Sequence, residues 1–501
     1  MVSRILGFAR DILVAAYLGA GPVADAFFVA FKLPNFFRRL FAEGAFNAAF
    51  VPLFAARLAE AGHDAAQRFA AQVMSVMVVF LFCFITALQI AMPWLMVVIA
   101  PGFVGDAEKF TLAVEMARTT FPYLLFISLV SLMGGVLNTL DRFAAAAATP
   151  IILNIVLITA LLTVTPFVPT PGHALSWGVA AAGIGQFLWL IAACRRENIR
   201  FALPRPRLTP RVRRLLRLML PGAIGAGVVQ INLLVDIVIA STLPTGAVSF
   251  LYYADRVNQL PLGVVGVAIG TALLPLLSRQ LRTGEIAAAA NSMNRGIEVA
   301  LLLTVPAAAA LLVIAQPIVI VLFERGAFDG GVSASTAQAL MAYAVGIPAY
   351  VLIKVLAPGF FAREDTATPV KIAIFCVVLN IALSLILIQF LAHAGIALAT
   401  GIVAWINAGL LAWILQRRGH HAADARLWAR LPRIVLAAAG MAACLWGALY
   451  FMGDVFAASG SLRIAALAGL IGFGLVLYFG LAAVLGAARL SDVKSMLGRK
   501  R

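Results

Sequence analysis

Arginine side chains stand inside stretches of this sequence that are otherwise apolar. Arg4 and Arg10 lie in the first stretch, Arg38 lies in the second, and Arg256 lies in a later one. A guanidinium is always ionised, and its planar N–H groups match two phosphate oxygens at once. Because a charge at the centre of a bilayer costs about 2.5–3.5 kcal/mol, such groups face water, a counter-ion or each other. The four arginines therefore predict a hydrated cationic cavity that binds a phosphorylated group.

The second apolar stretch also carries a polar stripe. Asp25, Lys32 and Arg39 recur at intervals of seven residues and so share one face of a helix. One interpretation adds this face to the cavity. The alternative, which we favour for Lys32 and Arg39, is that long basic side chains reach the aqueous interface with their charged ends.

Oxygen-bearing side chains suggest a second kind of site. Asp236 stands in one apolar stretch, and Asn380 and Ser384 stand four residues apart in another. Carboxylate, amide and hydroxyl oxygens can coordinate a small cation, and the carboxylate can exchange a proton. The three residues are a candidate cation-coupling group, and a satisfied buried polar cluster is an equal alternative.

The elements that must position these residues are membrane helices. Of the 501 residues, 63% are hydrophobic and 12% charged, and the mean hydropathy is +1.01. This composition is typical of an integral membrane protein. About 14 apolar segments approach the 20 residues that cross a bilayer, including 24–52, 112–138, 369–391 and 395–415. Their continuous apolar runs predict an all-α protein rather than a transmembrane barrel.

The net charge of +17 follows the connections between these segments. Lys and Arg gather in every second connection, above all in 195–217, whereas the intervening connections hold Lys109, Arg118, Arg325 and Arg463. The positive-inside rule then places both termini in the cytoplasm. This pattern explains the charge without nucleic acid, which would need a contiguous basic surface with stacking aromatics.

The two halves of the sequence resemble each other at a shift of about 225 residues. Pro122 and the Leu153-Asn154-Ile155 run have counterparts in Pro348 and Leu379-Asn380-Ile381. An even number of spans separates the equivalents, so two six-helix lobes should be related by a parallel pseudo-twofold axis, as in transporters that rock around a central site. We predict an N-lobe (1–194), a basic cytoplasmic linker (195–215), a C-lobe (216–415), and two extra helices with a basic tail (416–501).

Three other functions can be compared with this sequence pattern. A multidrug or O-antigen-type exporter has the same architecture, but a drug cavity suited to cations should be apolar and carboxylate-lined. An enzyme acting on polyprenyl phosphates would need an acidic metal or base cluster, and the five histidines show no ligand spacing. A scaffold would tolerate neutralisation of the deep charges. We predict a transporter without enzymatic activity and without a cofactor, apart from the candidate coupling cation.

Several stretches resemble one known family closely. They are Ser3-Arg4-Ile5-Leu6-Gly7-Phe8-Ala9-Arg10-Asp11, Ala24-Asp25-Ala26-Phe27-Phe28, Arg38-Arg39-Leu40-Phe41-Ala42-Glu43-Gly44, Tyr252-Tyr253-Ala254-Asp255-Arg256 and Lys354-Val355-Leu356-Ala357-Pro358. The sequence resembles the MurJ (MviN) family of lipid II flippases over essentially its whole length. That family belongs to the superfamily of multidrug, oligosaccharidyl-lipid and polysaccharide exporters.

The resemblance implies a specific activity and site. It implies export of the undecaprenyl-diphosphate-linked peptidoglycan precursor across the bacterial inner membrane for cell-wall synthesis. The arginines matching Arg4, Arg10, Arg38 and Arg256 should line the substrate cavity, with the acids matching Asp25 and Glu43 nearby. The last two helices should form a groove for the lipid tail. Sodium, protons or the membrane potential are candidates for coupling, and we expect a monomer whose partners are lipid II, membrane lipids and other cell-wall synthesis proteins.

Overall fold

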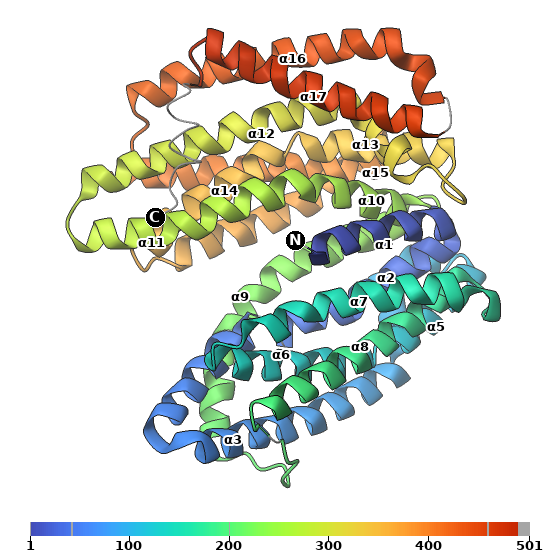
Figure 1. Cartoon of the computed structure of the whole chain (residues 1–501), viewed down its shortest axis with the longest axis vertical. Coiled ribbons are helices and arrows are strands. Elements are labelled where there is room, and N and C mark those ends of the chain that lie inside the picture. The colour runs from blue at the N-terminus through green and yellow to red at the C-terminus, as the bar shows by residue number, and fades with distance from the viewer. Residues whose placement is uncertain (1, 42–43, 200, 458–459, 489–501) are drawn as a thin grey trace. The chain divides into compact units, whose positions relative to one another are not determined.

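The described part of the chain consists of helices joined by turns and loops. The computed structural model describes every residue except 1, 42–43, 200, 458–459 and 489–501, and these described residues form no strand (Figure 1). The predicted all-α class is confirmed. The chain divides into two compact bodies: unit 1 comprises Met1–Ser249 with Arg325–Phe328, and unit 2 comprises Phe250–Glu324 with Asp329–Arg501.

Unit 1 holds the helices of the first half of the chain. They are α1 (Val2–Leu18), α2 (Pro22–Phe41), α3 (Ala45–Ile90), α4 (Met92–Ile99), α5 (Ala107–Thr120), α6 (Tyr123–Thr139), α7 (Phe143–Thr163), α8 (Pro171–Arg196) and α9 (Pro210–Ser241), with short 3-10 turns at Pro101–Phe103 and Thr165–Phe167. Helix α6 packs on both α3 and α8, and α2 lies against α5 and α8 (Figure 1).

Two predicted spans of this unit are broken. Segment 24–52 was predicted as one span, but α2 ends at Phe41 and α3 begins at Ala45. Segment 112–138 is divided between α5 and α6 at Phe121 and Pro122. The second break has a simple cause, because proline lacks the N–H that a continuous helix would need there.

Unit 2 holds the remaining helices. They are α10 (Ala247–Pro261, whose first turn belongs to unit 1), α11 (Val267–Arg282), α12 (Ile286–Phe323), α13 (Gly330–Ala344), α14 (Ile347–Phe361), α15 (Ala367–Arg417), α16 (Ala425–Ala457) and α17 (Ser461–Val484). A π-helical turn, Leu262–Gly266, joins α10 to α11. Helices α12, α16 and α17 pack side by side (Figure 1).

Helix α15 is interrupted by a sharp break in the backbone at Ala392. Ala392 has φ of 45° and ψ of −129°, outside the helical region. A side chain at Gly395 would lie 2.6 Å from the backbone of Leu387, so the chain turns back closely at this point. The division that the sequence predicted between spans 369–391 and 395–415 is therefore confirmed.

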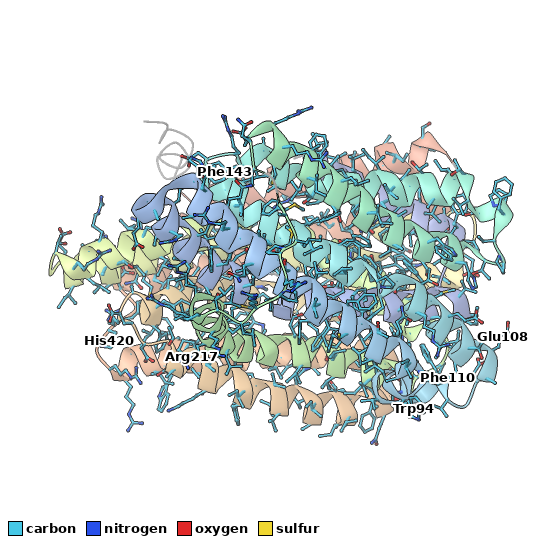
Figure 2. All side chains as sticks on the ribbon, turned by 90° about the horizontal axis from the view of Figure 1, so that it is seen from below. Trp94, Glu108, Phe110, Phe143, Arg217 and His420 are labelled. Carbon is cyan, nitrogen blue, oxygen red and sulfur yellow. The ribbon has the colours of Figure 1, made fainter. Side chains whose placement is uncertain are left out.

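The surface of these helices suits a lipid environment. Among the described residues, nine helical segments are long and apolar enough to cross a membrane. Large apolar side chains such as Trp94 and Phe143 lie on the outside, 69% and 57% exposed (Figure 2). Exposed apolar area of this extent is typical of a membrane-facing surface. The predicted count of about 14 spans is not confirmed, because several spans are broken and others are merged.

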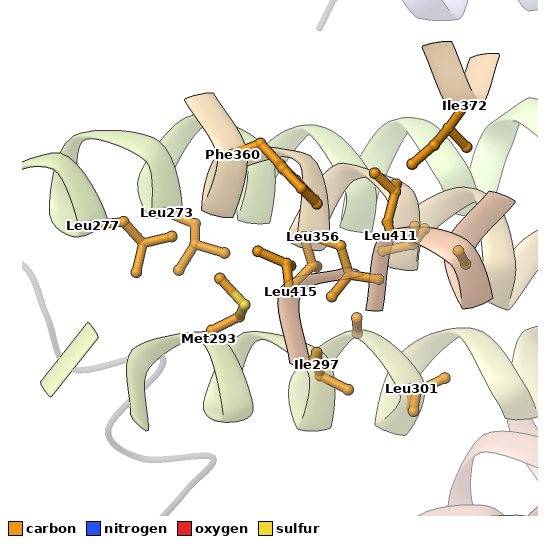
Figure 3. Close-up of a cluster of buried hydrophobic side chains, with 14 of the residues drawn as sticks. Leu273, Leu277, Met293, Ile297, Leu301, Leu356, Phe360, Ile372, Leu411 and Leu415 are labelled. Atoms are coloured by element: carbon orange, nitrogen blue, oxygen red, sulfur yellow. The ribbon is translucent and has the colours of Figure 1, made fainter. Parts of the chain in front are cut away.

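The core of unit 2 forms where α11, α12, α14 and α15 meet. Leu273, Met293, Leu356 and Leu415 interdigitate there (Figure 3). Helix α14 approaches closely at Gly359, where an added Cβ would lie 2.5 Å from the Met293 Cε atom. The lone glycine thus sets the spacing of three helices.

An ionic cluster joins α12 to α16. Glu298 is 4% exposed and accepts hydrogen bonds from Arg295, Arg426 and Arg430. Arg295 also pairs with Asp424, just before α16. One buried carboxylate is therefore the shared acceptor for cations from two helices.

The compact units are divided at other places than the predicted domains. Helix α9 belongs to unit 1 because it packs on α2, α3 and α4. The chain is therefore divided after Ser249, beyond the predicted linker 195–215. The predicted lobes were defined by a sequence repeat, whereas the units are defined by packing, so the repeat-based division stays a prediction.

Asp365 binds Thr368 at the start of α15 and Arg418 just after its end, and these contacts should make the free energy of unfolding depend on pH. Its carboxylate accepts from the Thr368 backbone and hydroxyl at 2.9 and 2.6 Å and from Arg418 Nη1 at 2.6 Å. These donors lower the pKa of Asp365 from 3.8 to about 2.

We expect Asp365→Asn to lower the free energy of unfolding by about 1 kcal/mol at pH 7, allowing for solvent screening. Because the folded-state pKa is lowered, the difference from wild type should persist above pH 4 and vanish towards pH 2; denaturant titrations across that range measure it. A pH-independent difference would contradict the expectation.

Candidate functional site

Arg10 on α1 is held inside unit 1 by two polar partners. Its Nε and Nη2 atoms donate to Asp11 Oδ1 at 3.1 and 2.6 Å, and its Nη1 donates to Asn154 Oδ1 of α7 at 3.0 Å. Asp11 and Asn154 are 4% and 5% exposed. A buried carboxylate needs such donors to offset the loss of water. The guanidinium is therefore fixed in place between two helices.

Arg4 lies one and a half turns earlier on the same helix and is exposed. The neighbouring Ser3 carbonyl accepts from Asn154 Nδ2 at 3.0 Å. Asn154 thus contacts both the start of α1 and Arg10. The structure ties this end of α1 to α7 and leaves the Arg4 side chain at the surface.

Arg38, near the end of α2, lines a cavity inside unit 1. The cavity has a volume of about 360 Å³ and lies between α2, α3, α6, α7 and α8. Neutral polar side chains face it from all five helices: Asn35, Asn47, Ser131, Asn138, Thr149 and Gln186. Among the described lining residues, Arg38 carries the charge. The site is polar and cationic rather than carboxylate-lined.

Asp25 occupies a different setting from the one predicted. It is 1% exposed; its Oδ2 accepts from Lys109 Nζ and Gly246 N, both at 2.8 Å, and its Oδ1 accepts from Ser249 N and Oγ at 3.0 and 2.6 Å. Four protein donors thus occupy the carboxylate. In this conformation Asp25 links α2, α5 and the first turn of α10 rather than presenting oxygens to a ligand.

The remaining predicted residues of the cationic site are placed separately. Glu43 lies outside the described residues. Arg256 belongs to unit 2, where its guanidinium lies 4.8 Å from the centre of the Tyr252 ring on the same helix. An aromatic face stabilises a cation that is partly withdrawn from water. The structure therefore groups Arg10 and Arg38 in unit 1 and describes Arg256 in unit 2.

The candidate cation group is distributed in the same way. Asp236 lies on α9 in unit 1, whereas Asn380 and Ser384 lie on α15 in unit 2, 1% and 0% exposed. Asn380 Oδ1 accepts from Thr400 Oγ1 at 3.4 Å. Thr400 is an additional oxygen donor that the sequence pattern did not indicate.

An apolar groove of about 250 Å³ runs between α12, α16 and α17. Leu302 and Leu311 line it from α12, and Leu445 and Leu475 line it from the last two helices. Tyr478 also lines the groove, and its hydroxyl donates to the Leu302 carbonyl at 2.7 Å. The lining suits a hydrocarbon chain.

Three functional candidates were missed in the sequence. Gln186 is a single amide within a predicted span, a position where a polar side chain indicates function by its cost alone. Asn47 stood at the end of a span that was assigned too long. Lys109 was expected in an exposed connection but is 4% exposed, and no sequence signal marked its pairing with Asp25.

Comparisons of the sequence with known proteins point to one family. The sequence model described as lipid II flippase MurJ matches residues 14–466. A probable lipid II flippase MurJ of Rhizobium meliloti is 48% identical, covering 99% of this chain and 94% of that protein. The lipid II flippase MurJ of Burkholderia cenocepacia is 37% identical, with 97% and 95% covered.

Solved structures extend the comparison. One titled lipid II flippase MurJ in an inward closed conformation superposes with a TM-score of 0.80 at 25% identity, covering 96% of both chains. An inward-facing transporter of the MATE family gives 0.70 at 14% identity, with 83% of this chain and 94% of that chain covered, which shows the fold alone. The family model and the near full-length relatives show that this chain belongs to the lipid II flippase MurJ family.

Proposed function

We propose that this protein moves lipid II, the undecaprenyl-diphosphate-linked peptidoglycan precursor, from the cytoplasmic to the periplasmic leaflet of the bacterial inner membrane. Membership of the family supports the cargo. The observation that carries the chemistry is Arg10, whose guanidinium is fixed within unit 1 beside Asp11 and Asn154. A guanidinium charge held at a fixed place within the membrane suits a diphosphate, whose charge could not otherwise cross the hydrocarbon layer.

The proposed mechanism is alternating access. The diphosphate and its sugars enter from the cytoplasm, where both termini and the basic connections lie, and the arginines Arg4, Arg10, Arg38 and Arg256 hold the charge. Movement of one lobe against the other, as in transporters built from parallel repeats, then exposes the head to the periplasm. The apolar groove of α12, α16 and α17 offers the tail a path that stays in hydrocarbon.

Return of the empty carrier needs energy. A cation at Asp236, Asn380 and Ser384 could supply it, as could the membrane potential, which does about 2.3 kcal/mol of work per charge and 100 mV. The buried Asn380 and Ser384 support the first possibility. The protein is proposed to work as a monomer, with no cofactor.

Complementation tests the function directly. In a bacterium depleted of its own flippase, expression of this chain should restore growth and return lipid II to the periplasmic leaflet, measured by a periplasmic enzyme that acts on exposed precursor. Depleted cells without the chain should accumulate the precursor on the cytoplasmic leaflet. Persistent cytoplasmic accumulation, with the chain present in the membrane, would contradict the proposal and favour another exporter of the superfamily.

A further inference from the structure

We propose that the cavity inside unit 1 is a subsite for a sugar ring of the cargo, seated beside Arg38. The inference rests on the proposed function and adds to it a location within one unit. Its basis is a pair of buried amide oxygens, one on Gln186 of α8 and one on Asn47 of α3, at the wall of the cavity.

The side-chain amide of Gln186 is held by its nitrogen, while its oxygen has no hydrogen-bond donor among the described residues. Its side chain is 2% exposed, and its Nε2 donates to the Thr149 carbonyl at 2.8 Å. That bond determines which way the amide points. Its Oε1 is buried and accepts no hydrogen bond from the residues that the structure describes. Buried acceptors are rarely left in this condition, so a donor is expected in the cavity: water when the cavity is empty, and a ligand group when it is filled.

Asn47 on α3 has the same arrangement, with its amide nitrogen bonded and its amide oxygen without a donor among the described residues. Its Nδ2 donates to Ser131 Oγ of α6 at 3.1 Å, which directs its Oδ1 inward, where none of the described residues donates to it. Helix α6 presents Gly135 at this point, and a Cβ there would lie 3.3 Å from the Asn47 oxygen. The absence of a side chain on Gly135 keeps the space around the acceptor open.

The chemistry of the lining selects the ligand. Two fixed acceptors require O–H or N–H donors, and the positive charge of Arg38 at the cavity wall favours a ligand that also carries an anionic group. A pyranose with hydroxyls and an N-acyl group, attached to a phosphate, supplies both. A hydrocarbon tail would leave the amides unsatisfied, and a cationic drug would oppose Arg38. The 360 Å³ volume is at the small end of ligand pockets, which suits one ring rather than the whole head group.

The position also fits loading. Asn138 and Thr149 flank the connection between α6 and α7, which the charge pattern assigns to the cytoplasm. The predicted order is therefore that the sugar enters unit 1 from the side on which the precursor is made.

Binding measurements on the full-length chain in nanodiscs test the subsite. The probes are undecaprenyl diphosphate, which has no sugar, and lipid II. Gln186→Met removes the acceptor while nearly keeping the shape, and Asn47→Leu does the same on the opposite wall. Each variant should bind lipid II about tenfold more weakly, the equivalent of one hydrogen bond, and bind undecaprenyl diphosphate as wild type does. Ser176→Ala, which removes a buried hydroxyl of α8 that donates to the Gly172 carbonyl outside the cavity, is the matched control and should change neither affinity.

The outcomes separate the subsite from the function. The subsite proposal is wrong if the variants bind both probes more weakly to the same extent. It is also wrong if both variants fold and bind both probes as wild type does. Either result would hold even if the chain complements a flippase-depleted cell. Selective weakening of lipid II binding would support the subsite even if complementation failed, which would then count against the proposed function alone. A variant that does not fold is replaced by the other, since each removes a different acceptor.

Discussion

Glu298→Ala is expected to lower the free energy of unfolding by about 3–5 kcal/mol. Glu298 is the shared acceptor of Arg295, Arg426 and Arg430, and Arg430 is itself 6% exposed. Removing one member of a buried ion pair leaves the other charge without compensation, which costs more than the pair contributes. Denaturant titration of the purified protein in mixed micelles, with tryptophan fluorescence as the signal, gives the difference.

Two companion variants identify the cause. Glu285→Ala, on an exposed acid at the start of the same helix, should change stability by less than about 0.5 kcal/mol. Glu298→Ala combined with Arg430→Leu should recover part of the loss, because the most buried cation that Glu298 contacts is then absent. A single-variant loss below 1 kcal/mol would show that α16 is held on α12 by apolar packing rather than by this carboxylate.

Arg10→Ala is expected to reduce lipid II translocation roughly 100-fold or more. Two charge-assisted hydrogen bonds to a diphosphate at about 1.5–3 kcal/mol each would account for that factor. Arg10→Lys should keep the charge but lose the planar fork, and should recover only part of the activity. Translocation is measured by complementation and by access of periplasmic enzymes to the precursor, with membrane abundance of each variant determined in parallel.

Arg10 also compensates the buried Asp11, so the single variant alters stability as well as binding. The double variant Arg10→Ala with Asp11→Asn removes both charges and should restore the stability of unit 1 while remaining inactive. If the double variant transports lipid II at the wild-type rate, Arg10 serves only to neutralise Asp11, and its proposed contact with the diphosphate is wrong.

The sequence by itself determined the class of fold and most of the helices. A composition of 63% hydrophobic residues and continuous apolar runs left few alternatives to membrane helices. The sequence also predicted the turn near residue 392, because apolar segments 369–391 and 395–415 are each long enough to span a bilayer. The breaks at Pro122 and after Phe41 were not placed, since hydropathy averages over a helix and does not register an interruption of one or two residues.

Only the tertiary structure decided what each polar residue contacts. Asp25 and Arg38 stand on the same helix with similar sequence surroundings, yet four donors occupy the first, whereas the second lines a cavity. Gln186 and Asn47 are far apart in the sequence, and their shared cavity arises because α3, α6 and α8 pack together. A sequence pattern shows that a polar group is costly in a membrane helix; which partner offsets that cost depends on distances between helices, and these are set by packing.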